Sequence, residues 1–269
     1  MADNARKRTV ARSQKGSRPQ GGARDREAER NRLATTLVLA LFALVAIAMA
    51  TFAWFSIADN AKTRMLALDA NADGSMRFDL DAHRDFDDYV KTLGFDQISS
   101  RIASEKGVDI DASKLQPVTT SDYQTFTFED GSAADASTGA YLEFTLHFMA
   151  QDDLTVRLTG QDGKDGAAGT RFSSSVDGMA SAMRMSFTAD GQTWVYNPNG
   201  GSGSGGGAAV FGLGTGEADA SSNMFGLAAN TDKPVTVRIW LEGTDPNCTN
   251  ILKGADYQVS MRFVGVENQ

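Results

Sequence analysis

One uncharged segment, Leu33–Ile57, limits what this chain can become. Its sequence is LATTLVLALFALVAIAMATFAWFSI, and as a helix it is long enough to cross a bilayer core, which needs about 20 apolar residues. Interfacial aromatic residues gather at its far end and arginines precede it: Phe52, Trp54 and Phe55, and Arg24, Arg26, Arg30 and Arg32. The sequence therefore predicts a single transmembrane helix, with the N-terminus in the cytoplasm and everything after about Ser56 outside.

The residues leave open whether this helix stays in the membrane as an anchor or is removed as a signal peptide. The apolar run is longer than the 7–15 residues of a usual signal-peptide core, which favours a retained anchor. Small residues around Ala50 and Ala53 nevertheless offer cleavage sites. In both cases we expect the rest of the chain to be extracellular.

The charged residues divide the chain at this helix. Residues 1–32 hold ten of the 26 Lys and Arg residues but only four of the 34 Asp and Glu residues, so the tail is basic and the remainder is acidic. The tail has almost no apolar residues and is expected to be disordered in the cytoplasm. Beside a membrane span, its positive charge is better explained as an orientation signal touching anionic lipid than as a nucleic-acid site. We therefore expect a membrane partner and no nucleic acid.

From residue 58 onward, apolar and polar residues alternate as they do in half-buried strands. In AYLEFTLHFMA the apolar positions are Leu142, Phe144, Leu146 and Phe148. The same period marks KPVTVRIWLEG and ADYQVSMRFVGV, and residues 189–192 read as a hairpin turn. Helical spacing is confined to DFDDYVKTLGF and DQISSRIASEKG. The pattern predicts a mainly β domain over 58–269, a β-sandwich with one or two short helices and a flexible glycine-rich loop at 199–207.

The single cysteine, Cys248, excludes an intramolecular disulfide, so the domain must be stabilised by its core. The thiol is either a small buried apolar group or a group able to cross-link two chains. Burial is the favoured interpretation.

A candidate metal site lies in LDANADGSMRFDLD. Asp69, Asn71, Asp73 and Ser75 occupy positions 1, 3, 5 and 7 of the calcium-loop pattern, with glycine at position 6. Position 12, which should be a bidentate glutamate, is Leu80, and both flanks resemble strands rather than helices. The residues favour a hairpin turn, since Asn, Asp and Gly suit turns, and calcium binding is the alternative.

Three aromatic residues, Trp194, Tyr196 and Trp240, could form a platform for a sugar. Trp240 shares a strand face with polar residues, so it is either covered by a loop or exposed for binding. The covered state is favoured, and the platform is kept as an alternative.

Residues suited to catalysis are scarce. His83 and His147 are the two histidines of the chain, and neither lies in an HExxH zinc motif. No Gly-x-Ser-x-Gly elbow is present, and the cysteine has no evident histidine partner. His147 lies on the polar side of its predicted strand, which favours a surface histidine. We therefore predict no enzyme and no cofactor, although a catalytic pair of carboxylates would be invisible in so acidic a chain.

Two stretches suggest a family. ATFAWFSIADN, preceded by a charged tail and an apolar helix, resembles the signal segment of camelysin/TasA-like proteins. VRIWLEGTDPNCTN with YQVSMRFVGV is similar to the C-terminal strands of singly anchored surface proteins. The resemblance implies an exported protein of Gram-positive bacteria with a jelly-roll-like β-sandwich, some members forming biofilm-matrix fibres. Camelysin is described as a metalloprotease, but this chain has no zinc motif to carry that activity.

Together these features predict a membrane-anchored cell-surface protein with a structural, matrix or adhesive role, which associates with itself, with surface proteins or with glycans. The alternatives are an extracellular module that binds a glycan or calcium and, less favoured, a hydrolase.

Overall fold

The structure is a computed structural model that describes residues 35–41, 64–73, 75–110, 115–164, 166–200, 203–205, 208–213, 223–252 and 254–267, with the backbone alone over 64–73 and 203–205. Residues 35–41, inside the predicted membrane segment, form a helix. The rest of that segment and the tail lie outside the described residues, as do Ala50 and Ala53. Within the described part of the chain, no helix is long and apolar enough to cross a membrane. Met1–Ala50 and Thr51–Gln269 are two separate compact units.

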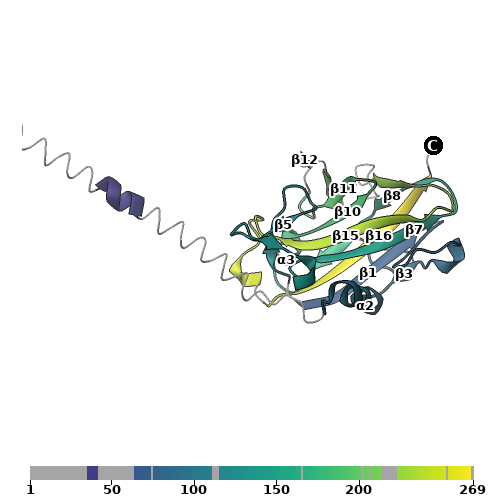
Figure 1. The fold of residues 1–269 in the computed structure, drawn as a ribbon, viewed down its shortest axis with the longest axis horizontal. Coiled ribbons are helices and arrows are strands. Elements are labelled where there is room, and N and C mark those ends of the chain that lie inside the picture. The colour runs from purple at the N-terminus through teal and green to yellow at the C-terminus, as the bar shows by residue number, and fades with distance from the viewer. Residues whose placement is uncertain are drawn as a thin grey trace, which may run out of the picture. The chain divides into compact units, whose positions relative to one another are not determined.

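The second unit is mainly β with few helices, which confirms the fold class at that level (Figure 1). Counted over the described residues, one sheet, named sheet A, has six strands in the order β14, β8, β16, β1 and β3, with β9 also paired to β16. The bounds are β14 Asn223–Leu227, β8 Leu154–Leu158, β16 Asp256–Glu267, β1 Arg64–Asp73, β3 Thr92–Leu93 and β9 Arg171–Ser173.

Sheet B has eight strands within the same described ranges, in the order β12, β13, β11, β10, β15, β7 and β2, with β4 beside β15. The bounds are β12 Gly203–Gly205, β13 Ala208–Phe211, β11 Gln192–Tyr196, β10 Met183–Ala189, β15 Lys233–Glu242, β7 Leu142–Ala150, β2 Met76–Asp79 and β4 Pro117–Val118. β12 lies within the glycine-rich stretch that was predicted to be a loop. Its backbone pairs with β13 because strand pairing needs no side chains.

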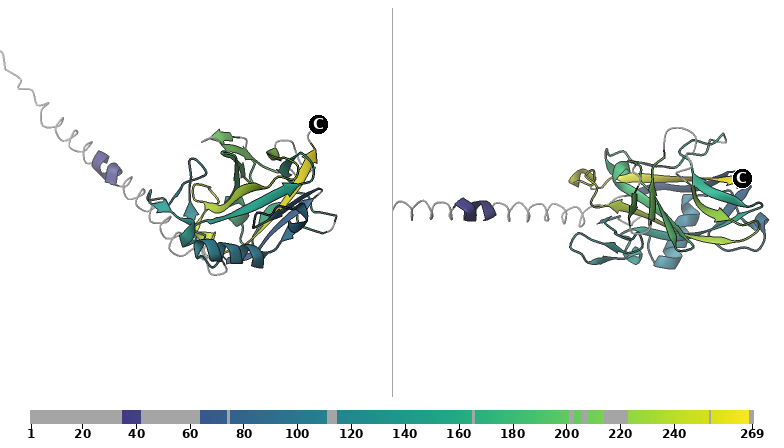
Figure 2. Two further views of the ribbon diagram at one scale, coloured as in Figure 1. Left: turned by 45° about the vertical axis from the view of Figure 1, so that its right-hand side comes forward. Right: turned by 90° about the horizontal axis from the view of Figure 1, so that it is seen from above.

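The remaining elements are short. β5 (Phe126–Thr127) and β6 (Ala133–Ala134) pair with each other, and α2 (Phe95–Lys106) is the longest helix among the described residues. Figure 2 shows α2 alongside the strands. The others are η1 Phe86–Asp88, η2 Ala136–Thr138, α3 Met179–Ala182 and η4 Asn250–Leu252.

Sheets A and B pack against each other through an apolar core. Phe263 of β16 lies at its centre, with ring centroids 5.8, 5.1 and 5.6 Å from Phe78, Phe148 and Phe187, which belong to β2, β7 and β10 of sheet B. The edge-on arrangement of these rings is the favourable one. Two sheets that share one core agree with the predicted β-sandwich.

The β10–β11 hairpin forms where the sequence predicts it. Ala189 pairs with Gln192, and Asp190 and Gly191 between them have φ of +51° and +75°. Positive φ at both central residues is the geometry of a type I′ turn, which Asp-Gly favours.

The outer face of sheet B is also covered, which the alternation did not predict. Residues 117–141, named the outer cover, begin as β4 within sheet B, then fold over this face and build a second apolar cluster around Trp240. Phe126 of the cover stacks on Tyr141 at 4.3 Å and meets Trp240 edge-on at 5.2 Å. Sheet B is therefore buried on both sides over part of its area.

We expect Phe263→Ala to lower the free energy of unfolding by about 3–5 kcal/mol, because it leaves a cavity between the sheets. Urea unfolding of the full chain measures this. Gln258→Ala, an exposed position on the same strand, should stay within about 0.5 kcal/mol of the native value. Equal effects of the two substitutions would contradict the central place of Phe263.

Candidate functional site

The predicted calcium residues do not form a loop. Asp69, Asn71 and Asp73 lie in β1, whose backbone runs parallel to β16. An extended strand advances about 3.3 Å per residue, so Asp69 and Asp73 are about 13 Å apart along it. A calcium loop must instead curve so that its oxygens lie 2.3–2.6 Å from one ion. Among the side chains that the structure describes, which do not include those of β1, no cluster of three or more His, Cys, Asp or Glu residues is arranged to hold a metal ion.

The predicted hairpin at this place is wrong. Ser75 lies in a turn, but β1 belongs to sheet A and β2 to sheet B. The turn therefore joins the two sheets. Turn residues mark a reversal of the chain, and they carry no information on which sheet the next strand enters.

The three aromatic residues of the predicted platform do not share a face. Trp194 and Tyr196 contribute to the core between the sheets, where they are 8% and 6% exposed. Trp240 is fully buried on the opposite face of sheet B under the outer cover, as the favoured interpretation predicted. A common sugar platform of these three side chains is therefore not formed.

A pocket of about 240 Å³ nevertheless lies beside Trp240, between the outer cover and sheet B. We name it the outer pocket. Its floor is apolar, with Trp240, Val195 and Val210, and its walls are polar. The polar residues are Thr119, Thr120, Tyr123, Arg184, Asn197, Glu242 and Thr244.

One wall is a tightly bonded loop of the outer cover. The carboxylate of Asp122 accepts hydrogen bonds from the amides of Gln124 (2.9 Å) and Thr125 (2.7 Å) and from the hydroxyls of Thr125 (2.8 Å) and Thr120 (3.2 Å). Partial burial raises the pKa of Asp122, but these hydrogen bonds outweigh it and lower the pKa to about 2.

Tyr123, in the same loop, has a φ of +58°, which is uncommon for an aromatic residue. Such a conformation costs about 1–3 kcal/mol and persists only where its surroundings hold it. Here the hydroxyl of Thr120 accepts a hydrogen bond from the Tyr123 amide at 2.8 Å. The result is that the Tyr123 ring lies 6.3 Å from Trp240, centroid to centroid.

Another part of the wall is fixed by one ion pair and by hydrogen bonds to Glu242. The Arg184 guanidinium is bonded to Asp245 and donates to the carbonyl oxygens of Ser181 and Met183, at 2.6 and 2.8 Å. Glu242 accepts from the indole Nε1 of Trp240, at 3.0 Å. The amide and hydroxyl of Thr244 also donate to Glu242, at 3.2 and 2.7 Å.

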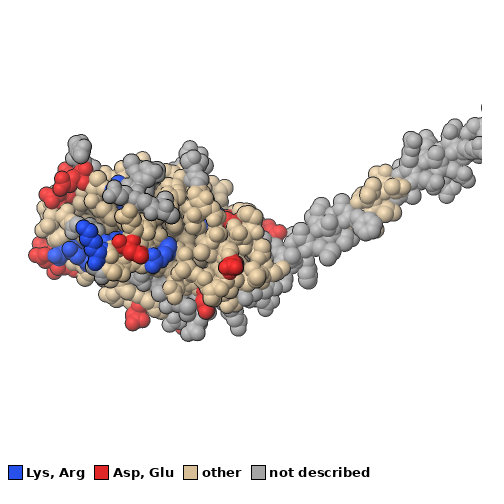
Figure 3. All heavy atoms as spheres, turned by 180° about the vertical axis from the view of Figure 1, so that it is seen from behind, with Lys and Arg blue, Asp and Glu red and all other residues tan. Residues whose placement is uncertain are grey.

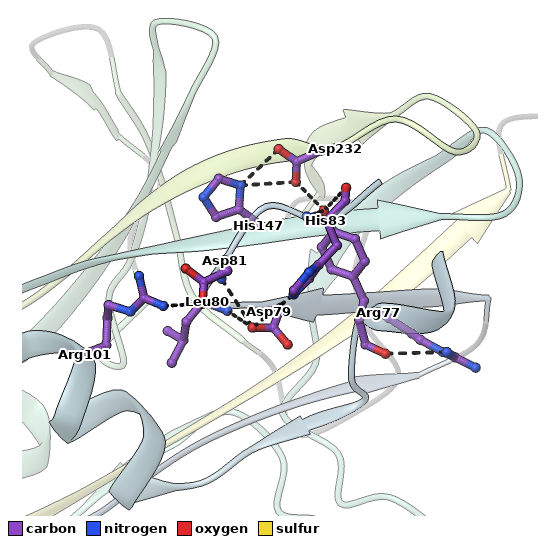
Figure 4. Close-up of polar contacts among 9 residues, drawn as sticks. Arg77, Asp79, Leu80, Asp81, His83, Arg101, His147 and Asp232 are labelled. Atoms are coloured by element: carbon purple, nitrogen blue, oxygen red, sulfur yellow. Dashed lines mark hydrogen bonds and ion pairs between the residues drawn. The ribbon is translucent and has the colours of Figure 1, made fainter. Parts of the chain in front are cut away.

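Both histidines of the chain meet at another place, on the outer side of β2 and β7. Nδ1 of His147 lies 3.0 Å from Oδ2 of Asp232, and Figure 4 shows its ring turned toward that carboxylate. The Tyr89 hydroxyl donates to Asp232 at 2.7 Å and accepts from the backbone amide of His83 at 2.9 Å. Nε2 of His83 lies 3.7 Å from Asp79. We name these five residues the histidine network.

The histidine network fastens the loop between β2 and β3 to sheet B. Burial raises the pKa of Tyr89 to about 12, so its hydroxyl keeps the proton that it donates to Asp232. Next to the network Arg101 of α2 binds Asp81 at 2.6 Å, and the hydrogen bond from this arginine lowers the pKa of Asp81 (Figure 4). His147 is thus a half-buried, paired residue rather than the predicted surface histidine. Its partner lies far along the chain, where strand periodicity gives no signal.

The other predicted feature is the thiol. Cys248 is buried, which confirms the favoured interpretation. Burial raises its pKa to about 12, so the thiol is neither charged nor accessible for cross-linking.

The surface carries charges of both signs side by side, as Figure 3 shows from behind. Arg171 and Asp162 form one such pair at 2.6 Å, with both side chains at least half exposed. Pairs of this kind add little stability because water screens them.

Comparison with protein-family models, with curated proteins and with solved structures found no match for this chain.

We expect Asp122→Asn to destabilise the domain by about 1 kcal/mol at pH 7, because a neutral amide accepts weaker hydrogen bonds. The pKa of Asp122 in the folded state lies below 3.8, the ordinary value for an aspartate side chain. The ionised carboxylate therefore stabilises the fold above about pH 4, and this contribution disappears as the pH falls toward 2. Urea unfolding at pH 7, 4 and 3 measures this. The free energies of unfolding of the native chain and of Asp122→Asn should become more similar as the pH falls. Asp85→Asn is the control: this residue is exposed and its side chain makes no capping hydrogen bond, so the substitution should stay within about 0.5 kcal/mol of the native value at pH 7.

A matched pair of tyrosines tests the histidine network. Tyr89→Phe removes one of the two partners of Asp232, which keeps His147, and leaves the His83 amide without its tyrosine partner, so it should cost about 1–3 kcal/mol. The Tyr257 hydroxyl is fully buried and has no hydrogen-bond partner among the described residues. Tyr257→Phe should therefore leave stability unchanged or raise it, as urea unfolding would show. The opposite ranking would contradict the hydrogen bonds assigned to Tyr89.

Proposed function

We propose that the chain is a single-pass cell-surface protein, anchored through residues 33–57 with its N-terminus in the cytoplasm. Its extracellular jelly-roll-like β-sandwich has a structural, matrix or adhesive role. The observation that carries this proposal is the position of β1.

β1 begins a few residues after the predicted span and pairs with β16 along its length, from Arg64 opposite Asp256 to Asp73 opposite Val264. On its other side β3 pairs with β1 only at Ala70 and Asn71. Over Arg64–Asp69 one edge of the strand thus has no strand partner among the described residues. An edge of this kind can pair with another chain.

Two mechanical consequences support a structural role. A pull on the predicted anchor reaches the domain at the start of β1, which its pairing with β16 holds in sheet A. In addition, β1 can be exchanged between molecules: when it leaves the β16 of its own chain and pairs in the same register with the β16 of the next chain, the molecules join head to tail. Such heterologous contacts build open filaments when they do not close into a ring.

The alternative of a glycan-binding module is supported by the outer pocket. For the calcium alternative, the extended backbone at Asp69–Asp73 offers no support. The hydrolase alternative has no supporting observation.

Cross-linking of the full chain in detergent tests the strand pairing. Leu68 and Val259 are register partners, so a variant with Leu68→Cys, Val259→Cys and Cys248→Ala should form disulfides under mild oxidation. Exchange of β1 between molecules predicts covalent oligomers that grow with protein concentration. Sedimentation velocity of the unmodified chain should show the same growth, with calcium or with chelator.

The matched control replaces Arg64 and Val264 by cysteine, because these positions lie at opposite ends of the β1–β16 pairing. This variant should not cross-link. Disulfides confined to single chains, together with a monomer at every concentration, would contradict assembly through β1.

A further inference from the structure

We propose that the outer pocket binds a single ring of a neutral sugar. The proposal goes beyond the structural role, because it concerns a different sheet from the one that carries β1. It uses none of the backbone pairing on which assembly depends.

The lining of the outer pocket matches the two sides of a sugar ring. One side of such a ring presents C–H groups and packs on aromatic or aliphatic surface, which the partly exposed Tyr123 and Val210 provide over the buried Val195 and Trp240. The hydroxyls around the ring both donate and accept hydrogen bonds. In the walls the Thr119 hydroxyl can do the same and the side-chain nitrogen of Asn197 can donate, whereas the Thr120 and Thr244 hydroxyls already donate to Asp122 and Glu242.

The charges in the pocket favour a neutral ligand. Arg184 is already paired with Asp245, so it offers no uncompensated positive charge to an anion. Glu242 is held by Trp240 and Thr244 and places a carboxylate in the wall, which repels acidic groups. A phosphate or carboxylate ligand would therefore meet repulsion without a compensating cation.

The size of the pocket limits the ligand to one ring. Its volume of about 240 Å³ lies just below the range of about 300–1,000 Å³ that is usual for small-molecule sites. Thr244 at the rim is exposed, so the pocket opens to solvent and a longer glycan could continue outward from the bound ring.

The walls are held in place without a ligand. Asp122 and Thr120 fix the strained backbone at Tyr123, and the Glu242 carboxylate fixes the Trp240 indole. Strained non-glycine residues cluster at binding sites, where the surrounding structure keeps a side chain in a required position. A site with prearranged walls loses less entropy on binding.

Binding can be measured by saturation-transfer NMR and titration with the full chain, in a detergent whose headgroup is not a sugar. The probes are the methyl glycosides of glucose, galactose, mannose and N-acetylglucosamine, with glucuronic acid as the anionic comparison. We expect saturable binding of at least one neutral probe and weaker binding of glucuronic acid.

Two variants locate the site. Tyr123→Asn removes the ring but keeps a residue that tolerates positive φ, and it should weaken binding about tenfold. Thr119→Val keeps the branched shape, removes one hydroxyl and should also weaken binding. Gln124→Ala changes an exposed neighbour outside the pocket and should bind like the native chain. Thermal unfolding shows that each variant is folded.

The proposal is overturned if none of the neutral probes binds, if glucuronic acid binds more tightly, or if Tyr123→Asn binds as well as Gln124→Ala. None of these outcomes alters the sedimentation result, which tests assembly through β1. A chain that assembles without binding sugar would keep the structural role and exclude the sugar site. A chain that binds sugar but stays monomeric would keep the sugar site and exclude assembly through β1.

Discussion

Sheet A depends on the pairing of β1 with β16, the first and last strands of the β domain. β16 has β1 on one side and β8 and β9 on the other, and its inner face places Phe263 against sheet B. These strands are far apart in sequence, so bringing them together closes long loops at a cost in chain entropy. The sheet therefore forms only once β16 is available, whereas the β10–β11 hairpin of sheet B forms from neighbouring residues.

Burial of both faces of sheet B explains its polar network. A sheet with one face in water can leave outward charges hydrated, but here the outer cover lies over part of that face. Glu143 of β7 accordingly meets Arg238 of β15 and Lys106 of α2, each at 2.7 Å. Partial burial raises the pKa of Glu143, but these two cations outweigh it, and the pKa is lowered. Removing one partner would leave a partly buried charge without compensation, which is costly.

The sequence was informative where one strand face meets the core. Alternation predicted β7, β15 and β16, and the Asp-Gly turn predicted the β10–β11 hairpin, because both depend on residues close together in the chain. It was uninformative about which partner covers each face. Trp240 could be assigned to the outer face of its strand, but only the fold shows that residues 117–141 bury it.

The geometry of each candidate site depends on backbone conformation and on residues that are distant in sequence. The spacing of Asp69, Asn71 and Asp73 suits a calcium loop only if the backbone curves, and pairing with β16 keeps it extended. The histidine network joins His147 to Asp232, and the outer pocket joins Tyr123 to Trp240. Each pair combines distant segments, so no local motif announces it.

The two proposed activities occupy separate parts of the fold and can operate in one molecule. Strand pairing uses the backbone of β1 in sheet A, next to the predicted anchor. The outer pocket stands on β15, β11 and β13 of sheet B, on the face turned away from sheet A. β15 lies in the interior of its sheet, between β10 and β7, so the pocket floor is held by strand pairing on both sides. Assembly through β1 would thus repeat the pocket along a filament, and weak binding of single rings would become strong binding of a multivalent glycan.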